Sequence, residues 1–203
     1  MHILSVRLFN TNNTPEPVLL AQAEDLSTVP FLARLSGSVS ETLLFLSRTF
    51  ASRSPRGARQ GCREGEYTGW IYHRPDGLAG VVICDQEYDR RVAFGLVHKY
   101  MGIYEEANWA WSTYDEDSTR REPSLERLLA TYQKPMDADA IAKINHDLEA
   151  TRVTLHKSVD ALLERGEKID TMVDKSADLS KQAKKFYKKS KKLNSWCGSC
   201  AIS

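Results

Sequence analysis

The sequence has no long apolar run. No stretch approaches the roughly 18 apolar residues that indicate a membrane-spanning helix. Residues 1–9 have no charged region followed by a long apolar one, so we predict no secretory signal. The net charge of only +1 does not suggest a nucleic-acid-binding protein. We therefore expect a protein that faces the cytosol, binds no nucleic acid and meets a membrane only from outside.

Cysteine is also scarce, and no catalytic motif is present. The four cysteines are Cys62, Cys84, Cys197 and Cys200, and none belongs to a double C-x-x-C or a Cys/His zinc pattern. The five histidines have no ligand spacing, and the chain has no glycine-rich phosphate loop or nucleophile elbow. We predict reduced thiols, no metal site, no enzyme activity and no cofactor other than a covalent lipid.

Residues 1–133 are typical of a single domain of the α+β class. Apolar runs bounded by turn residues predict strands over 2–9, 17–22, 59–64, 67–73 and 78–84. Apolar residues at helical spacing predict helices over 38–52, over 90–104 and from Pro123 onward. The run 78–84 is almost wholly apolar, so we place it centrally in the sheet. The dipeptide Lys134-Pro135 ends the last helix.

A heptad pattern follows over residues 141–193, which contain no proline and one glycine. The pattern alternates steps of three and four residues, and eleven of its sixteen positions are apolar. Its positions other than Arg165 are Ile141, Ile144, Leu148, Thr151, Leu155, Ser158, Leu162, Ile169, Met172, Ser176, Leu179, Ala183, Phe186, Ser190 and Leu193. This spacing predicts one coiled-coil helix, roughly 80 Å long at ~1.5 Å per residue. The domain cannot cover such a helix, so it needs partner chains or a folded-back form.

Arg165 is the one charged residue among these positions. A buried guanidinium has five donors and no acceptor, so partner helices must supply carbonyl oxygens at the same level. Glutamine side chains would do so, and such a polar layer fixes the register and the number of helices. The alternative is an ordinary coiled coil from which Arg165 extends into solvent.

The chain ends in Cys200-Ala201-Ile202-Ser203, a C-a-a-X motif that predicts farnesylation of Cys200. One lipid gives only marginal membrane binding, so a second signal is expected. Cys197 is a candidate for palmitoylation, and the seven lysines within residues 181–192 would attract anionic lipid. Alternatively, those lysines form a solvated helix end, and the terminal cysteine occurs by chance.

The sequence resembles the prenylated longin R-SNAREs of the YKT type over essentially its whole length. The central match is Leu162–Asp170, the zero-layer core of R-SNAREs, with seven layers before Arg165 and eight after it. Other matching segments are Ala51–Arg53, Glu64–Gly69, Gly80–Ile83, Asp85–Tyr88 and Lys185–Lys188. One difference is that the family has two adjacent cysteines before its last three residues, whereas here Cys197 and Cys200 are separated.

The resemblance implies a profilin-like longin domain over 1–133, a linker over 134–140, an R-SNARE motif over 141–193 and a lipidated tail over 194–203. The longin domain would be a five-stranded antiparallel sheet between helices. The implied function is membrane fusion in ER–Golgi, endosomal or vacuolar, and autophagic transport. Implied partners are three Q-SNARE helices and a disassembly ATPase with its adaptor. Implied locations are the cytoplasm and the cytosolic faces of Golgi, vesicle and endosomal membranes.

Phe45 lies about 120° from the apolar stripe of the helix over 38–52, at ~100° per residue. An aromatic residue off the core face suggests a contact surface, and Phe45 matches the phenylalanine with which the family closes its longin domain over the SNARE motif. The alternative is a half-buried surface aromatic. A competing interpretation of the whole chain is a prenylated longin-type tether or trafficking regulator, which would need neither Arg165 nor its flanking layers.

Overall fold

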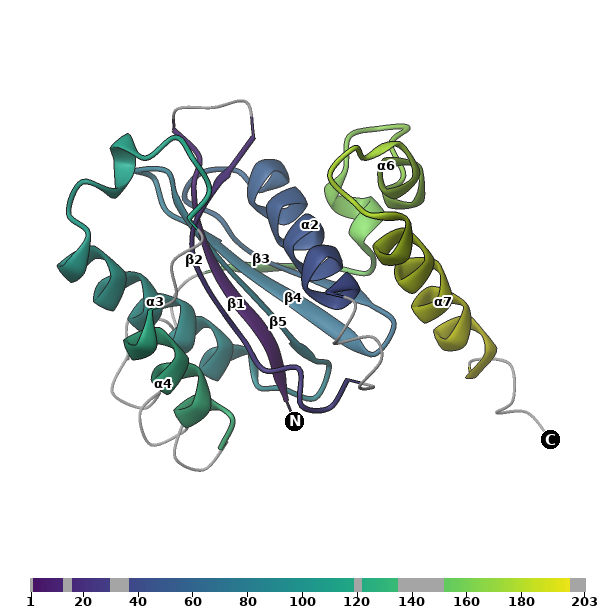
Figure 1. The fold of residues 1–203 in the computed structure, drawn as a ribbon, viewed down its shortest axis with the longest axis horizontal. Coiled ribbons are helices and arrows are strands. Elements are labelled where there is room, and N and C mark those ends of the chain that lie inside the picture. Colours follow the sequence, from purple (N-terminus) through teal and green to yellow (C-terminus); the bar gives the residue numbers. More distant parts are fainter. Residues whose placement is uncertain (1, 13–15, 30–36, 119–121, 135–151, 198–203) are drawn as a thin grey trace.

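The structure is a computed structural model that describes residues 2–12, 16–29, 37–118, 122–134 and 152–197, with the backbone alone over 192–197. Its fold is of the predicted α+β class (Figure 1). The elements of the N-terminal domain are β1 (Ile3–Asn10), β2 (Val18–Glu24), α2 (Ser38–Arg53), β3 (Arg59–Glu64), β4 (Tyr67–His73), β5 (Leu78–Asp85), α3 (Arg90–Ala107), η1 (Trp111–Thr113) and α4 (Pro123–Tyr132). Those of the C-terminal segment are β6 (Val153–His156), η3 (Val159–Leu162), α6 (Ile169–Lys175) and α7 (Lys181–Cys197).

The sheet has the strand order β2-β1-β5-β4-β3-β6. The first five strands pair antiparallel, as predicted, and their bounds lie within two residues of the predicted ones. Strand β5 is central and is buried at every residue except Asp85, because helices cover both faces of the sheet. The sixth strand, β6, was not predicted, and it pairs parallel to β3.

Two helical layers enclose the sheet (Figure 1). Helices α3 and α4 cover one face, where Leu125, Leu129 and Tyr132 of α4 join the core. Helix α2 covers the opposite face and is close to β4 at Gly69, where an added Cβ would lie 2.3 Å from Cε2 of Phe50. The sheet therefore separates two apolar clusters, an α3-side core and an α2-side core.

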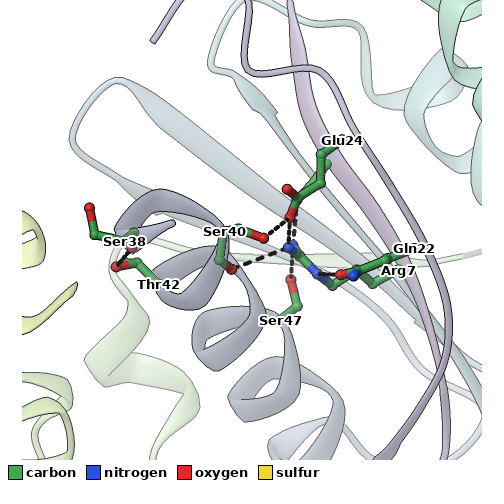
Figure 2. Close-up of polar contacts among 8 residues, drawn as sticks. Arg7, Gln22, Glu24, Ser38, Ser40, Thr42 and Ser47 are labelled. Atoms are coloured by element: carbon green, nitrogen blue, oxygen red, sulfur yellow. Dashed lines mark hydrogen bonds and ion pairs between the residues drawn. The ribbon is translucent and has the colours of Figure 1, made fainter. Parts of the chain in front are cut away.

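A buried polar network fixes α2 on the sheet (Figure 2). The guanidinium of Arg7 on β1 is fully buried and forms an ion pair with Glu24 on β2. It also donates hydrogen bonds to Gln22 Oε1 at 3.2 Å and Ser47 Oγ at 3.5 Å, and Ser40 Oγ donates to Glu24 Oε1 at 2.9 Å. Burial lowers the pKa of Arg7 to about 10, while the charge of Glu24 opposes that shift.

In this structure of the chain alone, the described part of residues 141–193 does not form the continuous helix that the heptad predicts with partner chains. Residues 141–151 lie outside the described residues, but residues 152–197 form a short strand, a 3-10 turn and two helices. Gly166, at φ +95°, lies between η3 and α6. A lone helix would leave its apolar positions in water, whereas the folded-back segment buries many of them on the domain. The folded-back alternative therefore describes the chain correctly, but without a continuous helix.

Candidate functional site

The candidate site is the contact between the N-terminal domain and residues 152–191, which we call the segment interface. Helix α7 lies alongside α2, and α6 lies next to α7 at the outer side (Figure 1). Strand β6 adds to the outer edge of β3 with Arg59 opposite Val153 and Cys62 opposite His156. An edge strand presents unpaired backbone donors and acceptors, and β6 supplies partners for those of β3.

The α2-side core continues across the segment interface. Residues from both sides form one apolar cluster, in which the domain contributes Leu43, Phe50 and Cys62 among others. The segment's fully buried members are Val159, Ile169, Val173, Leu179, Ala183 and Tyr187. Burying such side chains is worth roughly 1.5–3 kcal/mol for each aliphatic residue. Apolar packing is therefore the main force that holds the segment on the domain.

Polar groups of the domain pair with backbone groups of the segment. The carboxylate of Glu41 on α2 accepts a hydrogen bond from the Ser180 amide at 3.0 Å, just before α7 begins. The carboxylate of Glu64 on β3 accepts one from the Val159 amide at 3.2 Å, where η3 begins. Acceptors at helix starts satisfy amides that have no partner within the helix. The domain thus stabilises the two places where the segment changes direction.

Arg53, at the end of α2, forms ion pairs with two acids that flank the predicted layer arginine. Its guanidinium lies 3.1 Å from Glu164 and 2.9 Å from Glu167. Glu164 is largely exposed, so solvent screens that pair. The side chain of Arg165 itself is exposed and does not belong to the α2-side core. The segment interface therefore engages the neighbours of Arg165 and leaves its guanidinium accessible.

Helices α6 and α7 are joined by Asp170 and Asp174. Asp170 accepts hydrogen bonds from Lys191 at 2.7 Å and from the Tyr187 hydroxyl at 3.1 Å, and Asp174 pairs with Lys188 at 2.6 Å. The hydrogen bond from Lys191 lowers the pKa of Asp170 despite some burial. Burial alone would lower the pKa of Lys191, but the hydrogen bond and charge of Asp170 raise it.

The predicted layer residues divide into three groups in this structure. Those with buried side chains are Ile169, Leu179 and Ala183. Those with half-buried side chains are Ser158, Leu162, Met172, Ser176, Phe186 and Ser190. Leu155 and Arg165 are exposed. Ile141, Ile144, Leu148 and Thr151 lie outside the described residues, as does the side chain of Leu193.

The remaining predicted site residues have the following places. Phe45 is half-buried on α2 and packs against the α2-side core, the cluster that contains the buried residues of the segment. Cys197 is the last residue of α7, but its side chain lies outside the described residues, as does Cys200. The roles of these residues in lipid attachment and closure remain predictions.

Several residues of the segment interface were not predicted from the sequence. Arg53, Glu41 and Glu64 are ordinary surface residues in sequence, and only the folded structure brings them to the segment. Val159 and Val173 lie just outside the heptad layers, and a search for apolar residues off the layers would have found them. Over the described residues, the structure contains no helix long and apolar enough to cross a membrane. Nor do those residues bring together a group of ligands that could hold a metal ion.

Comparisons with known proteins match both parts of the chain. A synaptobrevin family model matches residues 140–199, and a longin family model, described as a regulated-SNARE-like domain, matches residues 27–121. The Synaptobrevin homolog YKT6 of Yarrowia lipolytica is 41% identical over 189 residues, which cover 91% of this chain and 93% of the relative. The corresponding protein of Saccharomyces cerevisiae is 40% identical over 88% of this chain and 90% of its own length. The VAMP-like protein YKT61 of Arabidopsis thaliana is 39% identical over 90% of each chain.

Proposed function

The chain belongs to the YKT6-type longin R-SNAREs, and on this basis we propose that it supplies the arginine-bearing helix of a four-helix bundle that brings two membranes together. Membership places it among proteins of vesicle trafficking that are not enzymes. The observation that carries the finer proposal is the uninterrupted run of layers on both sides of Arg165, within residues matched by the synaptobrevin model. Three Q-SNARE helices would complete the bundle, and an ATPase with its adaptor would take it apart.

The proposed bundle requires residues 141–193 to become one helix. In that helix the layer side chains face the partners, and Arg165 donates to carbonyl oxygens of three glutamines at the same level. The structure supports this proposal because Arg165 is exposed and its flanking acids, Glu164 and Glu167, are held by ion pairs with Arg53 at the domain surface. The rest of the segment must still leave the α2-side core before the bundle can form.

The folded-back chain is proposed to be an autoinhibited state. Ile169, Leu179 and Ala183 are layer residues, yet they are buried in the α2-side core of the same chain. One side chain cannot be buried in both places at once, so closure and bundle formation exclude each other. A partner helix must therefore compete with the longin domain for the segment. Tighter closure lowers the fraction of chains in the bundle, and tighter partner binding lowers the fraction of closed chains.

We further propose a lipid anchor at the end of α7, with farnesyl on Cys200 and palmitoyl on Cys197. The support is the C-a-a-X motif at 200–203 together with the lysines of α7, because a single lipid needs a second membrane signal. The closed form would reside in the cytoplasm. The open form would act on cytosolic faces of Golgi, vesicle and endosomal membranes, in ER–Golgi, endosomal or vacuolar, and autophagic transport.

Assembly with purified Q-SNARE helices tests the proposed function. The full chain, mixed with a panel of Qa, Qb and Qc helices, should form a complex that survives denaturing gel loading and melts only on heating. Arg165→Ala should assemble with the same set but melt at a lower temperature, since each unpaired buried glutamine carbonyl costs about 1–3 kcal/mol. The matched control is Arg152→Ala, an exposed arginine outside the layers, which should melt like the wild type.

Two outcomes would contradict the proposal. A chain that assembles with no set of Q-SNARE helices, even after Phe45→Glu has weakened closure, would favour the longin-type tether instead. Equal melting temperatures for the Arg165→Ala and wild-type complexes would mean that Arg165 is not buried in a central layer.

A further inference from the structure

The C-terminal segment carries a second apolar pattern beside its layers. Within residues 152–191, five large apolar side chains lie outside the layer positions, namely Val153, Val159, Leu163, Val173 and Tyr187. All five pack against the two cores of the longin domain, Val153 on the α3 side and the others on the α2 side. A bundle built on the layers does not need these residues, but the folded-back chain uses every one of them.

Three of the five share one heptad position. Val159, Val173 and Tyr187 are spaced by fourteen residues, and each directly follows a layer residue. If Ile141 begins the heptad at position a, these three occupy position e. Their exposed fractions are 1%, 0% and 6%, respectively. The other e positions in the described part of the segment, Arg152, Gly166 and Ser180, are polar or glycine, and none is buried.

The e residues are buried more deeply than the layer residues that precede them. Val159 follows Ser158, Val173 follows Met172, and Tyr187 follows Phe186; in each pair the first-named residue is buried and the layer residue is half-buried. In α6 and α7 the buried residues therefore occupy positions a and e, with Ile169 and Ala183 at position a. That face is rotated by roughly 50° from the a/d face of the layers, at ~100° per residue.

A four-helix bundle places position e at its flank, where charged residues such as Glu and Lys are usual. An aliphatic side chain there is tolerated but not required. In the folded-back chain, by contrast, Val173 is completely buried and cannot be replaced by a polar residue without cost. A polar side chain there would lose its contacts with water without gaining a hydrogen-bond partner. The two faces thus impose different chemical requirements on neighbouring residues.

We propose that Val159, Val173 and Tyr187 form a recognition strip for the chain's own longin domain. The strip lies beside the layers and acts together with the buried layer residues Ile169, Leu179 and Ala183, but partner helices do not need it. The inference rests on the proposed autoinhibition and names the residues that specify it. It follows that closure and bundle assembly can be weakened independently by substitutions at adjacent residues.

Three consecutive residues of α6 provide the test. Thr171 is exposed, Met172 is a half-buried layer residue, and Val173 is a buried e residue. Each is changed to Gln in the full, unlipidated chain. Glutamine favours helix about as well as methionine, so the three variants differ mainly in which face receives the polar group.

Closure is measured by the alkylation rates of two buried thiols in the same molecule. Cys62 on β3 lies in the α2-side core with Val159 and Ile169, and burial raises the pKa of its thiol to about 12. Cys84 lies in the α3-side core, which the e residues do not cover. Opening of the segment should expose Cys62 and leave Cys84 protected, so Cys84 reports whether the domain stays folded. The two modified peptides are separated by mass spectrometry.

We expect Val173→Gln to raise the Cys62 rate about tenfold or more, with Cys84 unchanged and the Q-SNARE complex melting as for the wild type. Thr171→Gln should match the wild type in both assays. Met172→Gln should lower the melting temperature of the complex and raise the Cys62 rate less than Val173→Gln does.

The proposal is overturned if Val173→Gln alkylates Cys62 no faster than Thr171→Gln, or if it destabilises the complex as much as Met172→Gln. If Val173→Gln also exposes Cys84, the domain itself has been destabilised and this variant is not informative. The Cys62 alkylation rate and the melting temperature of the complex are then measured for Tyr187→Gln, and the same two outcomes overturn the proposal. Failure of the wild-type chain to assemble with Q-SNARE helices would reject the proposed function, whereas the Cys62 rates would still decide whether the e residues hold the segment.

Discussion

Arg7 places a positive charge inside the longin domain, below the helix that receives the C-terminal segment. Its guanidinium bonds to β2 through Glu24 and Gln22 and to α2 through Ser47, so it joins three elements (Figure 2). Removing one partner of a buried ion pair leaves the other charge without compensation, which is more costly than losing the pair as a whole. The position of α2, and with it the segment interface, depends on this network.

Arg7→Met should lower the free energy of unfolding by roughly 3–5 kcal/mol, because the Glu24 carboxylate is then left largely buried without its guanidinium. The double variant Arg7→Met/Glu24→Gln should be more stable than Arg7→Met alone. Urea unfolding followed by tryptophan fluorescence measures both. If the two substitutions lower stability additively, the side chains do not act as a pair.

At the scale of elements, the longin domain followed its sequence pattern closely and the C-terminal segment did not. Strand β5 and helix α3 lie almost where they were predicted, because their apolar residues face cores formed within the same domain. Val153–His156 has a helical heptad pattern, yet it forms a strand because the free edge of β3 lies beside it. In the proposed bundle, the heptad pattern describes the segment bound to its partner helices. The sequence does not show which surface the segment contacts when those helices are absent.

The α6–α7 contact gives a prediction about pH. The pKa of Asp170 is lowered in the folded chain, so its contribution to stability is present above its unfolded value of 3.8 and is lost as pH falls through the folded value. Lys191 has a raised pKa, so its contribution is present below 10.5 and is lost as pH rises through its folded value. Between about pH 4 and 10, the contact should therefore not respond to pH.

Carbon-13 NMR of the Asp170 carboxyl group tests this expectation. Its titration midpoint should lie below 3.8 in the wild-type chain and should rise in Lys191→Met, because the first cause of the shift is the hydrogen bond from Lys191. The control is Lys189→Met, which removes an exposed lysine from the same helix. The two variants could also change the Asp170 midpoint equally. That result would show that the general positive charge of α7, rather than this hydrogen bond, lowers the pKa of Asp170.

At the scale of the whole molecule, closure links two surfaces that lie far apart in the sequence. Phe45 packs on the α2-side core, which the segment completes more than a hundred residues later. Helix α7, which holds the segment to α2, also ends at Cys197, one of the two proposed lipid sites. Any change that releases α7 from α2 should therefore act on membrane binding as well as on partner binding. The sequence suggested Phe45 as a contact residue, but Arg53, Glu41 and Glu64 became visible only in the folded chain.

Phe45→Glu should consequently move the protein from the cytosolic to the membrane fraction of cells. A carboxylate at this half-buried place loses water without gaining a partner, so the closed state is weakened. The end of the chain that carries the proposed lipid sites then becomes free. Ser52→Glu, on an exposed position of the same helix, should fractionate like the wild type.

Adding Cys200→Ser to Phe45→Glu should return the protein to the cytosol. This variant has no farnesyl group, and the remaining signals, palmitoylation and the lysines of α7, are not enough to hold the chain on a membrane. Equal distributions for Phe45→Glu and Ser52→Glu would mean that Phe45 does not contribute to closure. Membrane retention of the variant that lacks Cys200 would mean that Cys200 is not the site of the membrane anchor.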